Sequence, residues 1–100
     1  MITYLVLSRY TDHGIQRVKD APTRIDNFKK AVRLLGGEVH QLYLMLGGYD
    51  SACIISVPDD ETMARLALAV GSWGSVRTQS FRVFAEPEFR RLVTSLPAIG

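Results

Sequence analysis

Six side chains that could carry out polar chemistry are predicted to meet at one end of this 100-residue chain's fold. They provide two guanidinium groups, an imidazole, a phenol, a carboxylate and an indole: Arg9, His13, Tyr49, Asp50, Trp73 and Arg77. A carboxylate beside a guanidinium can bind an anion, with arginine as the electrophile and aspartate as the orienting group or base. Such a pair more often serves as a structural ion pair. The group therefore predicts either an anion or carboxylate site, or a fixed turn.

Asp50 and Tyr49 follow two glycines and have two interpretations each. The Asp50 carboxylate is expected to reach Arg9 or Arg77, where it would orient a substrate, or else to cap the turn. The Tyr49 hydroxyl could contribute to a pocket, but packing of its ring over Gly47-Gly48 is the favoured interpretation.

Three further residues give weaker signals. Trp73 lies in a Gly-Ser-Trp-Gly segment and could cover a ligand or fill a subunit contact, of which we favour the contact. His13 could carry protons or bind a metal, but beside Asp12 and Gly14 a surface position at a helix start is favoured. Cys53 lies in the middle of an apolar run and is expected to behave as a small buried hydrophobe. We predict no metal site.

The helices and strands that position these residues follow from apolar spacing. The predicted strands are Thr3–Arg9, Val39–Leu46, Tyr49–Val57 and Val76–Phe84. One amphipathic helix spans Ile15–Leu35 and is split by Pro22, a second runs from Asp59 to Gly71, and a short third begins at Glu86. Gly47-Gly48 is expected to form a tight two-residue hairpin turn.

The order of these elements, βαββαβ, is that of a ferredoxin-like α+β domain. Right-handed crossovers place both main helices on one face of a four-stranded antiparallel sheet of order 4-1-3-2, and we expect residues 1–100 to form a single domain. The strands carry apolar residues on both sides, and the final helix is too short to cover the second face. Two chains are therefore predicted to stack sheet on sheet as a dimeric α+β barrel.

The face between two such chains is a second candidate site. A lumen with hydroxyls and an imidazole would suit a small apolar ligand or a heme with an axial histidine. The residues concerned are Tyr4, His40, Tyr43 and Arg82. Because His40 and Tyr43 are three apart, they are expected to face opposite sides unless a bulge intervenes. The favoured alternative is an ordinary packed interface.

The amino-acid composition and the absence of certain motifs argue against several classes of function. With 12 Lys plus Arg and 10 Asp plus Glu, the net charge of +2 is too small to predict nucleic-acid or membrane binding. One cysteine and no long apolar run favour a cytoplasmic protein. Phosphate-binding glycine loops and serine-nucleophile motifs are absent from the sequence.

Several short blocks of the sequence resemble the GYD domain family. The blocks are Thr3–Leu7, Thr11–Ile15, Lys19–Pro22, Leu46–Asp50, Val57–Glu61 and Gly74–Thr78. The resemblance runs from about Met1 to Phe89. It implies a small bacterial or archaeal protein of the dimeric α+β barrel type, and it implies no particular reaction or cofactor.

These observations favour an oligomeric small-molecule-binding or regulatory domain with a pocket at or near a subunit interface. A second copy of the chain is expected as its protein partner, with a small-molecule ligand and without nucleic acid or membrane. One alternative is a small cofactor-free or heme-assisted enzyme, and another is an assembly subunit without ligand. The sequence does not decide whether the protein is an enzyme.

Overall fold

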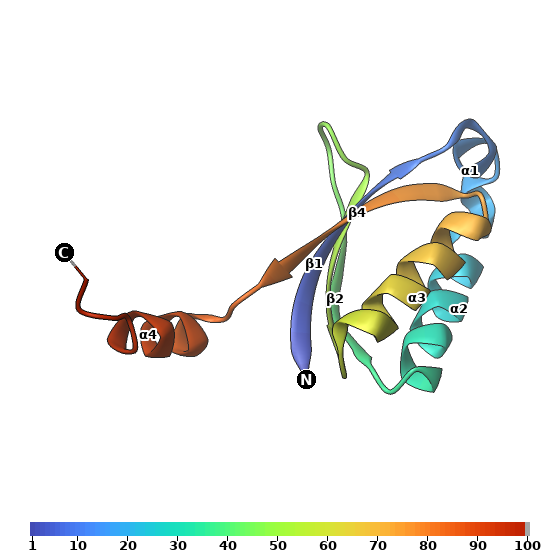
Figure 1. The fold of residues 1–100 in the computed structure, drawn as a ribbon. Helices are drawn as coiled ribbons and strands as arrows, with labels where there is room; N and C mark the ends of the chain where they lie inside the picture. Colours follow the sequence, from blue (N-terminus) through green and yellow to red (C-terminus); the bar gives the residue numbers. More distant parts are fainter. Residues whose placement is uncertain (100) are drawn as a thin grey trace.

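A computed structural model describes residues 1–99, and its elements follow the predicted order, including the short final helix (Figure 1). The strands are β1 (Ile2–Tyr10), β2 (Glu38–Leu44), β3 (Ser51–Val57) and β4 (Val76–Val83). The helices are α1 (Asp12–Gln16), the 3-10 helix η1 (Val18–Asp20), α2 (Ala21–Leu34), α3 (Asp60–Ser72) and α4 (Glu86–Thr94). Pro22 lies in the first turn of α2, where its missing N–H costs no intrahelical hydrogen bond.

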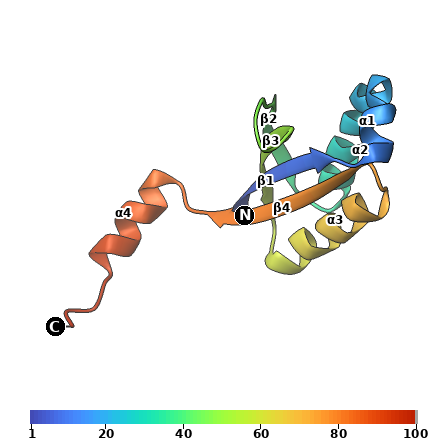
Figure 2. The same ribbon diagram turned by 90° about the horizontal axis from the view of Figure 1, so that it is seen from above.

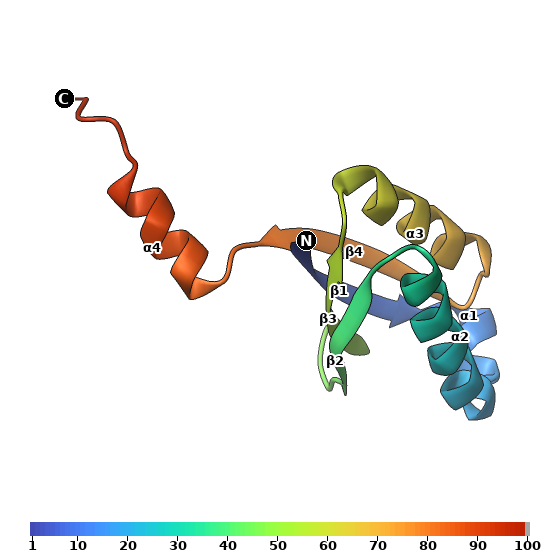
Figure 3. The same cartoon turned by 90° about the horizontal axis from the view of Figure 1, so that it is seen from below.

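The four strands form one antiparallel sheet of order β2-β3-β1-β4, which is the predicted order read from the other edge. Helices α2 and α3 lie side by side on one face of this sheet (Figures 1 and 3). The core fills the space between them. Its most deeply buried side chains come from α2, β3 and α3: Val32, Ile55, Val57 and Leu66.

The start of α1 is joined to the start of β4 by a close backbone approach. Thr11 donates its N–H to the Ser75 carbonyl (3.1 Å) and its hydroxyl to the Gly74 carbonyl (2.6 Å). The Thr11 hydroxyl also caps α1 by accepting the N–H of Gly14 (3.0 Å). A Cβ atom on Gly14 would lie 1.9 Å from the Ser75 carbonyl oxygen, so this approach requires glycine.

The prediction of a two-residue turn between β2 and β3 is wrong. The hairpin is closed by a hydrogen bond from the Met45 N–H to the Asp50 carbonyl (2.8 Å), so residues 46–49 form the turn. A two-residue turn of type I′ needs two positive φ angles, and of the glycine pair only Gly47 has one, at 126°. β2 therefore ends at Leu44, earlier than expected, and β3 begins at Ser51, later than expected.

A register shift in β2 changes which of its side chains share a face. The shift lies between Val39 and Gln41, and it pairs Val39 with Ile55 and Leu42 with Cys53. Ile55 and Cys53 are buried under the helices. Val39 and Leu42 therefore lie on the same side of the sheet, whereas uninterrupted alternation had predicted opposite sides.

The same register shift determines on which face of the sheet the β2 residues of the second candidate site lie. His40 Nε2 lies 2.6 Å from the Ser56 hydroxyl, on the face opposite the helices, and Tyr43 pairs with Ala52 on that face too. Tyr4 lies on the helix side, where its hydroxyl donates to Asp60 at the start of α3 (2.5 Å), and Arg82 is its cross-strand neighbour. The four predicted lumen residues therefore divide between the two faces.

Helix α4 does not pack on the sheet. Three views show it beyond the end of β4, away from the rest of the fold (Figures 1, 2 and 3). The molecule is accordingly elongated, 54 × 31 × 19 Å. Its accessible surface is 7009 Å², whereas a compact monomer of this mass has about 5,700 Å². The second face of the sheet is thus left without cover from its own chain.

Candidate functional site

Two of the six predicted site residues are in direct contact. The Arg9 guanidinium lies over the Tyr49 ring, 4.5 Å from its centroid, and Arg9 Nε donates to the Gly48 carbonyl (2.6 Å). The Tyr49 hydroxyl donates to the Gln79 side-chain carbonyl on β4. These contacts hold the β2–β3 turn against the end of the sheet.

Asp50 forms neither of the ion pairs expected for it. Within residues 1–99 no salt bridge joins its carboxylate to Arg9 or Arg77. Instead, Asp50 Oδ2 accepts the Tyr10 N–H (2.8 Å) and the Asp50 N–H donates to the Ser8 carbonyl (2.8 Å). Arg77 donates to the Gly71 carbonyl at the end of α3 (3.2 Å). Asp50 therefore ties the turn to β1.

Replacing Asp50 by alanine should lower the free energy of unfolding by about 1–3 kcal/mol, because the Tyr10 N–H is half-buried and would lose a charged acceptor. Asp50→Asn should cost less, since its amide oxygen can still accept this hydrogen bond. Urea unfolding of both variants measures the effect. Equal stability of wild type and Asp50→Ala would show that the bond does not hold the turn.

Among residues 1–99, no hydrogen bond or ion pair joins His13 or Trp73 to the other four predicted site residues. His13 is exposed on α1, and Trp73 follows α3 with 45% of its surface exposed. No group of three or more potential metal ligands occurs in the part of the chain that the structure describes. Arg77 is the cross-strand neighbour of Arg9, so the arginine pair, Tyr49 and Asp50 come from the same end of the sheet.

A cavity that the sequence did not reveal lies between the sheet and the helices. It has a volume of about 170 Å³, and its wall is mainly apolar, with contributions from α2, β1, β3 and the end of α3. Its lining includes Cys53, whose pKa is raised to about 11 by burial. The signal that could have found it is a set of small residues at corresponding positions of neighbouring strands: Ser8, Ser51 and Thr78.

The helix-free side of the sheet, here called the open face, is apolar at its centre. Leu5 on β1 pairs with Ile54 on β3 and with Phe81 on β4, and all three point away from the core residue Val6. Phe81 is 40% exposed. A contiguous apolar surface of this kind usually marks a site of interaction.

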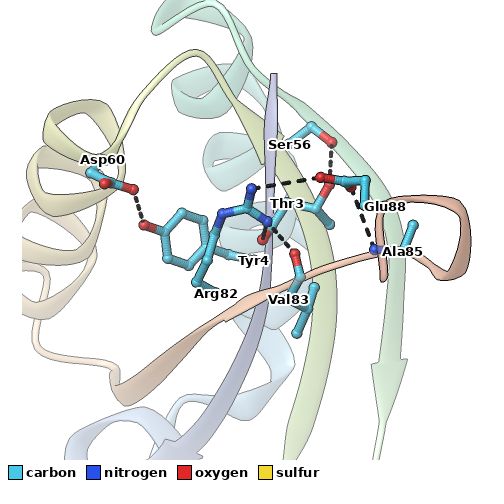
Figure 4. Close-up of polar contacts among 8 residues, drawn as sticks. All are labelled: Thr3, Tyr4, Ser56, Asp60, Arg82, Val83, Ala85 and Glu88. Carbon is cyan, nitrogen blue, oxygen red and sulfur yellow. Dashed lines mark hydrogen bonds and ion pairs between the residues drawn. The ribbon is translucent and has the colours of Figure 1, made fainter. Parts of the chain in front are cut away.

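Helix α4 carries a second exposed apolar stripe. Phe89, Leu92 and Val93 lie three and four positions apart and are all exposed. Figure 4 shows how the base of this helix is held: the Arg82 guanidinium lies 3.9 Å from the Glu88 carboxylate and donates to the carbonyls of Thr3 (3.3 Å) and Val83. The stripe is therefore presented on a helix with a tethered start.

An antiparallel sheet of this order with helices on one face defines the protein as a ferredoxin-like α+β fold. A family model described as GYD domain matches residues 4–93. The chain belongs to the GYD domain family, as the sequence blocks had indicated.

Two proteins of Thermus thermophilus are similar to this chain. One, named glutamine synthetase and cystathionine beta-lyase binding protein, is 36% identical over 81 residues, which cover 80% of this chain and 85% of the relative. The other is TTHA0845, whose crystal structure matches this fold with a TM-score of 0.55. The two chains are 24% identical, and the match covers 85% of this chain and 95% of TTHA0845. The second likeness concerns the fold alone.

The name of the first relative corrects the prediction about partners. We expected a second copy of the chain as the only protein partner, whereas that relative is named for binding two other proteins. The partner prediction, derived from the apolar open face, was wrong because an uncovered face does not tell which protein covers it. Separately, no helix among residues 1–99 has the length and apolar character needed to cross a membrane.

Proposed function

We propose that this protein is a protein-binding module that attaches to a metabolic enzyme through its open face and α4. The relative named for binding glutamine synthetase and cystathionine beta-lyase supports this class of partner. We also propose that binding takes place in the cytoplasm, in keeping with the single cysteine of the sequence.

The observation that carries the proposal is the amount of surface left uncovered. The chain exposes about 1,300 Å² more than a compact protein of its mass. One side of a stable protein–protein interface buries about 800 Å². The open face and α4 together therefore offer enough surface for a specific complex.

The character of this surface fits a protein partner. Its centre is apolar, with Leu5, Ile54 and Phe81 on the sheet and Phe89 and Leu92 on α4. Aromatic and large aliphatic side chains at the centre of an interface contribute most of its binding energy. The tether between Arg82 and Glu88 reduces the entropy lost when α4 docks.

The experiment is isothermal titration calorimetry of the purified protein with glutamine synthetase and with cystathionine beta-lyase from the same organism. We expect saturable binding to at least one of them. Phe81→Glu on the open face and Leu92→Glu on α4 should each weaken binding at least tenfold, because each places a charge in the apolar centre. The absence of binding to both enzymes would contradict the proposed partner class.

Leu68→Glu is the matched control. Leu68 is the same kind of exposed side chain, 75% accessible, but it lies on α3 on the other side of the sheet. This variant should bind within twofold of wild type. If Leu68→Glu abolishes binding and Phe81→Glu does not, the proposed surface is the wrong one.

The dimeric α+β barrel predicted from the sequence is the competing use of the open face. Two chains stacked by their sheets would cover the same Leu5, Ile54 and Phe81 side chains. Light scattering of the isolated chain distinguishes the two uses. A stable dimer that Phe81→Glu converts into monomers would overturn the assignment of this face to a different protein.

A further inference from the structure

The cavity between the helices and the sheet has features that the protein-binding surface does not explain. Its volume of about 170 Å³ is far larger than the space of one water molecule. An engineered apolar cavity of about 150 Å³ is known to hold benzene. The space therefore fits one small ring or a branched aliphatic group.

The sheet forms a polar floor beneath this apolar space. Ser8 on β1 pairs with Ser51 on β3 and with Thr78 on β4, so three hydroxyls lie in one row across the sheet. All three residues line the cavity, and Ser8 and Ser51 are hydrogen-bonded to each other. A hydroxyl that accepts this bond keeps its own O–H free to donate. The row can therefore bind one polar group of a ligand.

The cavity reaches the surface at two places. Its lining includes Leu44, which is 78% exposed on β2 and pairs with Ser51 on the helix side, and the half-exposed Trp73 after α3. Arg24 is the one charged residue in the lining, and its guanidinium donates to the carbonyls of Arg17 (3.1 Å) and Gly14 (3.4 Å). A small molecule can thus enter without unfolding of the core.

We propose that this cavity binds a small aromatic or branched aliphatic molecule that carries a single hydrogen-bonding group. The apolar body lies against Phe28 and Val70, and the polar group contacts the hydroxyl row of Ser8, Ser51 and Thr78. At neutral pH the Cys53 thiol beside them stays protonated, because burial raises its pKa to about 11. The site therefore binds its ligand without covalent attachment. This proposal does not depend on the partner of the open face.

The test uses benzyl alcohol and toluene as probes in a ¹H–¹⁵N NMR titration of the full chain. Benzyl alcohol should produce saturable shifts at the amides of Ser8, Ser51 and Thr78 and at the Trp73 indole N–H. Toluene, which lacks the hydroxyl, should bind several-fold more weakly. Thr78→Val, which removes one hydroxyl of the row and keeps the shape, should narrow this difference.

Cys53→Leu provides the blocking variant because it adds a larger side chain to the cavity wall, and it should weaken benzyl alcohol binding at least tenfold. Ala52→Leu is its matched control, since Ala52 is the neighbouring residue on the open face; it should bind within twofold of wild type. If Cys53→Leu does not fold, Ile25→Phe on α2 replaces it. Shifts that do not saturate, or unchanged binding by a folded blocking variant, would overturn the proposal, and the cavity would then hold water only.

Discussion

Replacing Ile55 by alanine should lower the free energy of unfolding by about 2–5 kcal/mol. Ile55 has no exposed surface and belongs to the buried cluster with Val32 and Leu66. The substitution removes three carbon atoms where neighbouring helices can relax only partly, so a void remains. At about 4–8 °C for each kcal/mol in a domain of this size, the melting temperature should fall by at least about 8 °C. Urea and thermal unfolding measure both quantities.

Ile54→Ala is the matched control for that experiment. Ile54 is the preceding residue on the same strand, but it faces the open side and is only half-buried. Ile54→Ala should lower the free energy of unfolding by about half as much as Ile55→Ala, or less. If the two variants are equally unstable in the isolated protein, the open face is covered in solution, and our description of it as a free surface is wrong.

Replacing Gly14 by alanine should lower the free energy of unfolding by a similar amount, but for a different physical reason. The added Cβ would lie 1.9 Å from the Ser75 carbonyl oxygen, and the obstacle is backbone that cannot rotate away. Helix α1 must therefore move, and the hydrogen bonds from Thr11 to Ser75 and Gly74 would stretch or break. We expect a loss of about 3 kcal/mol, at the upper end for overpacking.

Two measurements check the Gly14 prediction. Chemical denaturation gives the loss of stability, and hydrogen exchange should show faster exchange of the Thr11 N–H. Gly71→Ala is the control, because a Cβ there meets nothing within 4 Å and the position lies in α3. The free energy of unfolding of Gly71→Ala should equal that of wild type or exceed it by up to about 1 kcal/mol. A Gly14→Ala protein as stable as wild type would contradict the close approach.

The sheet and its two covering helices could be predicted from the sequence because the signals are local. The apolar spacing of Phe28, Val32 and Leu35 defines α2, and Gly36, with a φ of 83°, follows its end. Asp59 caps the start of α3 by accepting the Thr62 hydroxyl (2.7 Å) and the Thr62 N–H (2.8 Å), and these two hydrogen bonds lower the pKa of Asp59. Once these elements are known, chain connectivity restricts the strand order to few choices.

The parts that could not be predicted depend on distant neighbours. The register shift beside His40 exchanges the faces of residues in β2, and alternation alone gives no sign of a bulge. The sequence predicts that the Asp50 carboxylate pairs with Arg9 or Arg77, but the backbone N–H of Tyr10 on β1 donates to this carboxylate instead. The cavity arises because Ser8, Ser51 and Thr78 are small and adjacent, although they are far apart in the chain.

The pairing of β1 also has a consequence for how the chain folds during its synthesis. β1 is made first, yet its two neighbours in the sheet are β3 and β4, and β4 ends at Val83. Contacts between such distant segments slow folding, because a long loop must close before they form. On the ribosome the first strand therefore has an unpaired edge until more than four-fifths of the chain has emerged, and a nascent chain in this state is prone to aggregation unless a chaperone shields that edge.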